Sequence, residues 1–484
     1  MDLIKPEVKI GLEIHVQLTA LKTKLFCSTP ADYRSREPNT HVCPVCLGLP
    51  GTLPVLNRKA VEYAVAVALA LNCEMNEKLI FVRKHYFYPD LPKNYQISQY
   101  DGVGFTSIAK NGYVRIYIDG RSKIIRIRRI NIEEDPGKIQ YIGSIETSPY
   151  SLIDYNRSGI ALLEIVTEPD MESPKEAKAF LEKLIAILEY LNITDTSLEG
   201  AFRVDANISI AGGSRVEIKN IGSIKEVEKA LTYEIIRQKR IVELGGEVRR
   251  DTRHWDSSKG VTIPMRSKEY EEDYRYFPDP DLPPLIVTKE FIELVAKKVP
   301  ELPDERIERF MKQYKLDEYR ASVLVLIKWL ADFFEETAKM YNNYKKLADL
   351  LITDFLRWIK EFELDPRNLK VQPIHIVKLL QYLDKGVISI KMVKELLPKI
   401  IKEGVDVEKM VQEGYTKIDE ETLIENIVRE VMKENPKAVT DALENPKALN
   451  FIVGMVMKKT RGRADPSKTV EIIKKLLEEY KTRS

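Results

Sequence analysis

The sequence contains little that would cross-link the chain or anchor it in a membrane. Only four of its 484 residues are cysteine, and three of them fall within residues 27–46. So small and uneven a set fits a reducing compartment better than a disulfide framework. The apolar runs at residues 61–71 and 321–330 are too short to span a bilayer, and the first residues lack the layout of a signal peptide. We therefore expect a cytoplasmic protein.

An excess of charge of either sign is absent as well. Seventy-six basic and 74 acidic residues leave a net charge of +2, so any contact with a nucleic acid should depend on local patches. The sequence has neither a Gly-x-x-x-x-Gly-Lys-Ser/Thr loop nor the glycine motif of dinucleotide-binding folds. A nucleotide would therefore be bound by side chains and a metal ion. A hydrophobic content of 44% and a length of 484 residues predict an ordinary globular protein with about two to four domains.

The region from residue 8 to about 290 combines short strands with a few helices. Alternation of apolar and polar residues predicts strands at residues 9–18, 114–132, 161–166, 202–210 and 215–219. Helical periodicity predicts helices at residues 58–71, 174–191 and 224–244, with Asn57 and Ser173 as N-caps of the first two. Strands from distant parts of the sequence with few crossover helices predict an α+β domain with a large, mainly antiparallel sheet.

A proline cluster at residues 278–284 marks the end of this region. Residues 289–405 are almost entirely helical by period, and a second break falls around Gly404 and Gly414. In the last part, Asn435-Pro436 and Asn445-Pro446 predict two helix starts. The expected domains are residues 1–290, a helical domain at 291–405 and a small all-α tail domain at 406–484.

Carboxylates in or beside apolar strands are the first candidates for chemistry. Glu13 and His15 project from one face of a strand and could reach one metal ion or one substrate, although an exposed strand face has the same pattern. The consecutive acids at residues 133–135 repel one another unless solvent or a cation neutralises them, and an exposed acidic turn is the alternative. Glu164 lies among Leu, Ile and Val, so its burial requires a cation or a salt bridge to an arginine such as Arg157.

A second polar row follows on the strand at residues 202–210. Four polar side chains alternate along it, and a lysine lies on the next strand: Arg203, Asp205, Asn207, Ser209 and Lys219. Aspartate and asparagine supply oxygen ligands for a hard cation, and arginine can clamp phosphate. This row is unusually polar for a sheet that serves only as structure.

The cysteines and one aromatic segment give weaker signals. Cys43 and Cys46 form a Cys-x-x-Cys turn, and Cys27 lies sixteen positions before it. These thiols supply three of the four ligands of a structural zinc, with His41 as a candidate for the fourth; reduced thiols in a loop are the alternative. The basic, aromatic residues 83–96, which include His85, could stack a base or form an ordered surface loop.

Taken in order, these motifs resemble the B subunit of the tRNA-dependent amidotransferases. The resemblance covers the whole chain, and its motifs are residues 11–18, 43–51, 88–97, 133–138, 154–157, 164–166, 203–209, 215–220, 274–278 and 454–466. It implies a cradle-like catalytic domain, a helical domain and a small tail domain that contacts tRNA; for the basic tail, a solvated helix face is the alternative.

The resemblance also implies an activity in two steps. ATP phosphorylates the side-chain carboxylate of Glu or Asp misattached to tRNA(Gln) or tRNA(Asn), and ammonia then displaces the phosphate to give the amide. The ammonia comes from glutamine through the A subunit, which is an amidase, and a small C subunit tethers the other two. We therefore expect a carbon–nitrogen ligase that contacts neither DNA nor a membrane.

The residue roles implied by the resemblance fall into two sets. The metal site for Mg²⁺, or for Mn²⁺ because histidine is an unusual magnesium ligand, consists of His15, Glu133 and Glu164, with Glu13 beside them. The residues implied for ATP and its metal are Arg203, Asp205, Asn207, Ser209 and Lys219.

Some features depart from the family pattern. Thr29 stands where many relatives have a further cysteine, which leaves only Cys27, Cys43 and Cys46 as thiol ligands for zinc. Ala161 stands where proline is usual. The chain lacks the long insertion of the related E subunit, which favours the heterotrimeric enzyme. A non-catalytic tRNA-binding scaffold and a ligase acting on a free amino acid are the alternatives.

Overall fold

The computed structural model places most of the chain in two compact units. The described residues are 7–100, 102, 107–143, 148–210, 213–265, 274–412, 421–445, 448–460 and 463–483. The units are Met1–Pro303 and Asp304–Ser484. The expected further boundary near residue 405 remains a prediction. Within the described residues, no helix combines the length and apolarity needed to cross a membrane.

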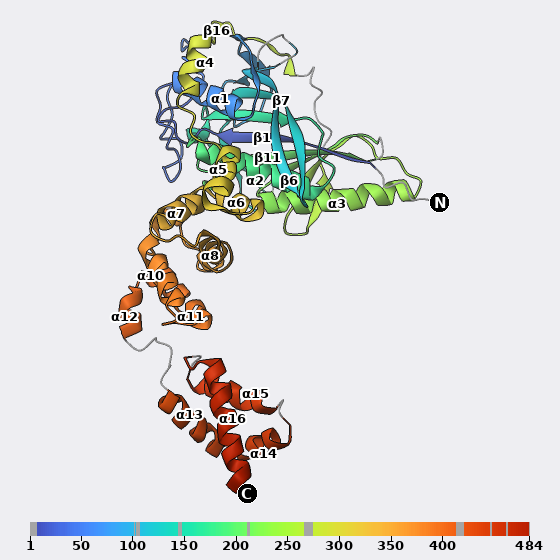
Figure 1. Cartoon of the computed structure of the whole chain (residues 1–484). Helices are drawn as coiled ribbons and strands as arrows, with labels where there is room; N and C mark the ends of the chain where they lie inside the picture. Colours follow the sequence, from blue (N-terminus) through green and yellow to red (C-terminus); the bar gives the residue numbers. More distant parts are fainter. Residues whose placement is uncertain are drawn as a thin grey trace. The chain divides into compact units, whose positions relative to one another are not determined.

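A nine-stranded sheet forms the centre of the first unit (Figure 1). Its strand order is β14-β13-β12-β11-β1-β10-β7-β6-β2, and all neighbours are antiparallel except β12 and β13. This confirms the predicted α+β class with a large, mainly antiparallel sheet. The strands are β1 (Val8–Gln17), β2 (Glu74–Met75), β6 (Ala109–Ile118), β7 (Arg121–Glu134), β10 (Ala161–Thr167), β11 (Phe202–Ile210), β12 (Val216–Ile221), β13 (Asp251–Asp256) and β14 (Val261–Pro264).

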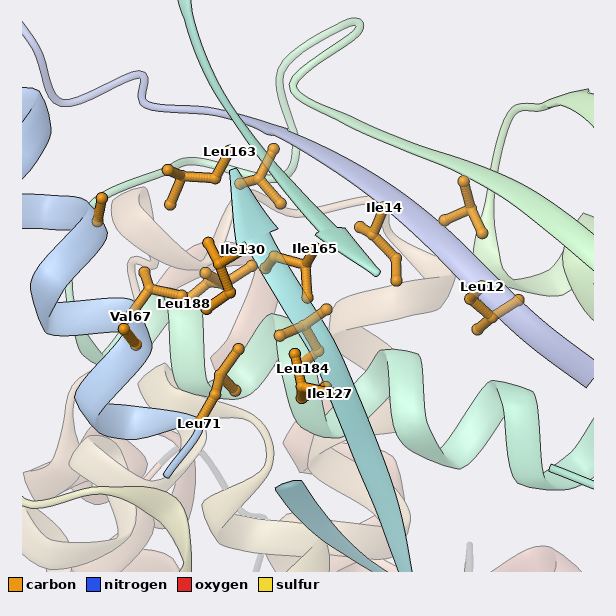
Figure 2. Packing of buried hydrophobic residues seen from close by; sticks show 14 of the residues in the cluster. Leu12, Ile14, Val67, Leu71, Ile127, Ile130, Leu163, Ile165, Leu184 and Leu188 are labelled. Carbon is orange, nitrogen blue, oxygen red and sulfur yellow. The ribbon is translucent and has the colours of Figure 1, made fainter. Parts of the chain in front are cut away.

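One face of this sheet is apolar and packs against α1 (Arg58–Ala70), α2 (Pro174–Tyr190) and α3 (Ile224–Glu243). Figure 2 shows Ile14 of β1 and Ile165 of β10 above Leu184 of α2. The predicted caps are confirmed, because Asn57 accepts from the amides of residues 59 and 60 and Ser173 from that of residue 176. Since a one-residue slip would turn the apolar side chains to the other face, burial of this face fixes the strand register.

The strand predicted at residues 114–132 is wrong, because the structure has a hairpin there. β6 and β7 pair up to Ile118 and Arg121 and are joined by Asp119 and Gly120. Both linking residues have positive φ, 49° and 74°, as a type I′ turn requires. The alternation continues through both strands, so it conceals the turn unless the Asp-Gly pair itself is recognised.

Smaller sheets lie beside the large one. β15 (Phe277–Pro278), β4 (Val82–His85) and β5 (Tyr95–Ser98) form a three-stranded sheet. Two strand pairs complete the set: β16 (Leu285–Ile286) with β3 (Lys78–Leu79), and β8 (Lys138–Tyr141) with β9 (Ser151–Asp154). The first unit also contains the short turn η2 (Tyr155–Arg157) and α4 (Lys289–Ala296).

The second unit is helical in its described residues, as predicted. Gly404, with φ of 69°, caps the end of one helix. Its elements are α5 (Pro303–Tyr314), α6 (Glu318–Val325), α7 (Lys328–Ala338), α8 (Tyr344–Leu350), η4 (Leu351–Phe355), α9 (Leu356–Glu361), η5 (Pro366–Asn368), α10 (Pro373–Asp384), α11 (Ile390–Glu403), α12 (Val407–Gln412), α13 (Glu421–Glu434), α14 (Pro436–Glu444), α15 (Leu449–Lys459) and α16 (Pro466–Arg483).

The tail helices α13 to α16 share a hydrophobic core that includes Ile424 and Ile473. The helix start predicted at Asn435-Pro436 is confirmed by α14. The second predicted start falls on Pro446, and the predicted break on Gly414; both residues lie outside the described residues.

Candidate functional site

The second face of the large sheet carries a row of polar side chains. In the strand register, His15 of β1 lies opposite Glu164 of β10, and Glu164 lies opposite Asn131 of β7. On the other side of β1, Glu13 lies opposite Asp205 of β11. Because β1, β7, β10 and β11 are neighbours in space but not in sequence, this face collects residues from four distant segments.

The four residues predicted as the catalytic centre come together on this face; we call them the carboxylate–histidine cluster (Glu13, His15, Glu133 and Glu164). One ligand atom from each of Glu13, His15 and Glu164 lies within 4.8 Å of the others. His15 Nε2 is 3.8 Å from Glu13 Oε1 and 3.8 Å from Glu133 Oε2. The side chain of Glu133 is held by Ser98, which donates to its Oε1. The alternative of an exposed strand face does not hold for these residues.

Burial and repulsion make Glu164 the most strained acid of the cluster. Its side chain is only 9% exposed. Burial, together with the charges of Glu133 and Glu13, raises its pKa well above the ordinary range. Asn131 donates to Glu164 Oε2 at 2.7 Å, and Arg129 Nε lies 3.9 Å from the same oxygen. Three carboxylates therefore meet here, and the charges of Arg129 and Lys84 offset their repulsion only in part.

These residues fit a divalent cation. Carboxylate oxygens are the preferred ligands of Mg²⁺, and an added imidazole also suits Mn²⁺. Asn131 Oδ1 is buried beside Glu164 and accepts no hydrogen bond from the described residues. A cation bound by His15, Glu133 and Glu164 would remove the repulsion that raises the pKa of Glu164.

The three consecutive acids at residues 133–135 are all buried, so the exposed acidic turn is wrong. Their environments differ. Glu133 faces the cluster, whereas Glu134 is paired with Lys93 and accepts from the amide of residue 97 at 2.9 Å. Asp135 accepts from Gln17 Nε2 at 2.6 Å and from Arg203 Nη2 at 2.9 Å. Of the three, only Glu133 therefore faces the candidate cation site.

The salt-bridge alternative for Glu164 holds with Arg129, whose Nε lies 3.9 Å from Glu164 Oε2, and not with Arg157. The Nε of Arg157 lies 3.8 Å from Asp135 Oδ1 and donates to the carbonyl of residue 136. Although burial alone would raise the pKa of Asp135, Arg203 and Arg157 hold it below its ordinary value. Asp135 therefore ties β11 and the turn after β9 to the end of β7.

Replacing Asp135 with alanine should destabilise the first unit by about 3–5 kcal/mol, because Arg157 and Arg203 lose a buried partner. The control is Asp170→Ala, which removes a surface ion pair with the largely exposed Arg126 and should cost less than about 1 kcal/mol. Denaturant unfolding of both full-length variants measures the difference. Equal losses of stability would show that the Asp135 pairing adds nothing beyond a surface salt bridge.

The residues predicted to bind ATP adjoin the cluster at β11 and β12. Lys219 Nζ is 2.9 Å from Asp205 Oδ2 and 3.3 Å from Glu217 Oε1. Burial would lower the pKa of Lys219. The charges of Asp205, Glu217 and Glu13 raise it by more than burial lowers it, so the ammonium is retained. The remaining two residues lie farther along β11: Asn207 opposite Gly11 and Ser209 opposite Lys9.

Sequence reasoning missed Lys84 as a site residue. This lysine lies on β4 with Nζ 5.0 Å from the ring centroid of Tyr274. Burial would lower its pKa, but Tyr276, Glu133 and Glu164 raise it. Its strand partner Gln96 has Nε2 3.5 Å from Glu133 Oε2, so Lys84 lies close to the cluster. Tyr276 in turn stacks on Tyr100 at 4.2 Å.

The segment at residues 83–96 forms parts of two strands and the connection between them. His85, the residue at the centre of the proposed base-stacking segment, stacks on Phe277 at 4.8 Å. A protein side chain therefore already covers one face of its ring. The alternation within β4 turns Lys84 and His85 to opposite sides, and a four-residue strand is too short to reveal this from sequence.

The predicted thiol group is also assembled. One sulfur from each of Cys27, Cys43 and Cys46 lies within 4.8 Å of the others. Lys24 is completely buried and donates to Cys46 Sγ at 3.6 Å. The hydrogen bond from Cys27, followed by the charge of Lys24, lowers the pKa of Cys46. His41 Nε2 instead lies 3.8 Å from an oxygen of Asp32, outside this thiol group.

Comparison with known proteins shows the family to which the chain belongs. Residues 8–293 match the family described as the GatB/GatE catalytic domain, and residues 332–477 match the GatB domain. The chain belongs to the GatB family. This confirms the resemblance found in the sequence motifs.

Members of the GatB family from distant organisms match along their whole length. A protein of Saccharolobus solfataricus is 58% identical over 472 residues, which cover 97% of this chain and 99% of that protein. Proteins of Carboxydothermus hydrogenoformans and Thermotoga maritima are 48% and 49% identical, and each match covers 97% of this chain and 98% of the relative. All three are named as the B subunit of an aspartyl/glutamyl-tRNA(Asn/Gln) amidotransferase.

Proposed function

We propose that this chain is the subunit of a tRNA-dependent amidotransferase that activates a carboxylate with ATP. Its substrate is Glu or Asp misattached to tRNA(Gln) or tRNA(Asn), and its product is the corresponding amide. The names of the full-length relatives support the tRNA substrate. The observation that supports the chemistry is the carboxylate–histidine cluster on the polar sheet face, with Lys84 on the strand next to Gln96, which contacts Glu133.

The proposed reaction explains why such a cluster is useful. A carboxylate is a poor acceptor of ammonia, because an oxide would have to leave. Transfer of the terminal phosphoryl group of ATP to the carboxylate oxygen releases ADP and gives an acyl phosphate. Ammonia then attacks the carbonyl carbon, and phosphate leaves. The first step brings two anions together, so it requires positive charge at the point where they meet.

Several residues of this chain would supply that environment. A divalent cation held by His15, Glu133 and Glu164 would neutralise charge on the phosphate oxygens. Lys84 would bind the phosphoryl group that is transferred. Lys219 and Asp205 form a pair beside Glu13 and would orient the nucleotide together with Arg203, Asn207 and Ser209.

The ammonia is proposed to come from glutamine hydrolysed by the A subunit, an amidase, and the small C subunit would be the third member of the heterotrimer. The heterotrimer would then be a carbon–nitrogen ligase with glutamine as the amide donor. The decisive experiment supplies the reconstituted heterotrimer with ATP and with Glu-tRNA(Gln), Asp-tRNA(Asn) or free glutamate, and measures amide formation and ADP release. Turnover on free glutamate alone would support an ordinary amide ligase and overturn the proposal.

The thiol group is proposed to hold a structural zinc ion through Cys27, Cys43 and Cys46. Three thiolates and Zn²⁺ carry one net negative charge, which the buried ammonium of Lys24 would balance. The hydrogen bond from Lys24 would also orient the sulfur of Cys46 toward the ion. Thr29 Oγ1, 3.4 Å from Cys27 Sγ, lies close to the place of a fourth ligand.

Purified protein should therefore contain about one zinc ion per chain, lost in Cys43→Ser but retained in Cys73→Ser. Cys73 is the matched control, because it packs against the hydrophobic core outside the thiol group. Elemental analysis by plasma mass spectrometry measures the zinc content. Zinc-free protein with three titratable thiols in this group would show that the cysteines are simply reduced.

A further inference from the structure

The hairpin of β6 and β7 exposes aromatic side chains along one face. Tyr113, Tyr117 and Ile124 are 41%, 45% and 50% exposed. Across the hairpin, Tyr113 pairs with Arg126 and Tyr117 with Ser122. The opposite face carries Val114, Ile116, Ile125 and Ile127, which are buried in the core. The exposed face is therefore not part of the packing of the sheet.

A β-bulge joins this face to the carboxylate–histidine cluster. Val166 of β10 lies opposite Arg129, but Thr167 lies opposite Ile127, so Arg128 is the extra residue on β7. The buried residues are Ile127 before the bulge and Ile130 after it. Residues 124 and 126 therefore share the sheet face with residues 131 and 133. Along β7, the thirteen residues from Arg121 to Glu133 span about 40 Å.

The hairpin is strongly basic within an almost neutral chain. Residues 109–130 contain seven lysine or arginine residues and one aspartate, whereas the whole chain has a net charge of +2. Some of these charges are matched, since Arg126 pairs with Asp170 and Lys123 with Glu176. Arg115 on β6 and Arg128 on β7 are exposed, and Arg115 lies opposite Ile124 on the same face as Tyr113 and Tyr117. The surface therefore suits a polyanion.

We propose that the exposed hairpin face, Tyr113, Arg115, Tyr117, Ile124 and Arg128, binds the single-stranded 3′-terminal segment of the aminoacylated RNA. This inference rests on the proposed function, which requires the amino acid at the RNA 3′ end to reach the carboxylate–histidine cluster. Exposed aromatic rings among arginines are the combination that stacks bases and binds phosphates of single-stranded nucleic acids. Tyrosine and arginine are also enriched in protein interfaces, so the continuity of this face with the carboxylate–histidine cluster is what favours RNA.

The test compares tRNA binding by reconstituted heterotrimers carrying the wild-type chain or one of two double substitutions. Tyr113→Ala with Tyr117→Ala should raise Kd about tenfold without changing its salt dependence. Arg115→Glu with Arg128→Glu should raise Kd and flatten the slope of log Kd against log salt by about 1.4, since each phosphate contact on a single strand contributes about 0.7. The matched control is Arg249→Glu with Arg250→Glu, two exposed arginines before β13 near the opposite edge of the sheet.

The second arm uses a tRNA that lacks its unpaired 3′ nucleotides. The wild-type heterotrimer should lose affinity for this RNA, and the hairpin variants should bind it as the wild type does. The assignment would be overturned if the hairpin variants lost as much affinity for truncated tRNA as for intact tRNA, or lost no affinity for intact tRNA. If a hairpin variant no longer purified together with the A or C subunit, the hairpin face would be a protein-binding surface instead. Amide formation by the wild-type heterotrimer, measured in parallel, tests the proposed function separately.

Discussion

Replacing Glu133 and Glu164 together with glutamine is expected to lower ATP-dependent amide formation by about a thousandfold. Glutamine keeps the shape of each side chain but removes the negative charge that a hard cation requires. Loss of the several kcal/mol that a bound cation contributes to phosphoryl transfer corresponds to a rate change of this size. The measurement is ADP release and amide formation on Glu-tRNA(Gln) by the heterotrimer.

The same double variant should remain folded, because the carboxylates it removes repel each other. Burial and the charges of Glu133 and Glu13 raise the pKa of Glu164, so in metal-free buffer the glutamines should leave the melting temperature unchanged or raise it. Affinity for tRNA should also change little. Glu228→Gln is the control, since Glu228 lies on α3 and pairs with Lys178. Full turnover by the double variant would favour a non-catalytic tRNA-binding scaffold.

The fold could be predicted closely wherever a stretch of sequence with a single hydrophobic period forms a single helix or strand. The strand predicted at residues 202–210 is β11 with the same ends, and the helix predicted at residues 58–71 is α1 with one residue fewer. The prediction of one strand at residues 114–132 is wrong, because two strands with the same alternation meet at Asp119 and Gly120. Period alone distinguishes strand from helix, but it does not locate a two-residue turn.

The site could be predicted only in part, because alternation gives the face of a residue but not its neighbouring strand. The strand pattern shows that Glu13 and His15 share a face. That Glu164 lies opposite His15 depends on the order β11-β1-β10-β7, which no local pattern specifies. The family resemblance supplied this grouping, and the register now gives its physical basis.

Lys84 could be predicted neither from the strand pattern nor from the family resemblance. β4 pairs with β15, whose residues lie almost two hundred positions later, and it carries only four residues. The aromatic residues around it suggested base stacking, whereas in the structure they form the surroundings of a retained positive charge. The base-stacking role predicted for residues 83–96 stays a prediction, and the structure adds Lys84 as a charged group in the same segment.

Replacing Lys84 with methionine should therefore lower the rate of ATP-dependent amide formation about a hundred- to a thousandfold, the usual effect of removing one preorganised group that stabilises developing charge. Methionine has a similar length and keeps the apolar stem, so packing against Tyr274 should persist. The loss should fall mainly on kcat, because the charge acts on the phosphoryl group during transfer. Steady-state kinetics with ATP and Glu-tRNA(Gln) separate kcat from KM.

Two matched variants make this result interpretable. Lys84→Arg keeps the charge and should recover part of the rate, although its planar head group differs from an ammonium. Lys78→Met removes an exposed lysine of the nearby strand β3 and should leave the rate unchanged. If Lys84→Met turned over normally, or if Lys78→Met lost as much activity, the charge of Lys84 would have no specific role. The positive charge opposite the carboxylate–histidine cluster would then have to come from the bound substrates and their metal, or from Arg129, whose Nε lies 3.9 Å from Glu164 Oε2.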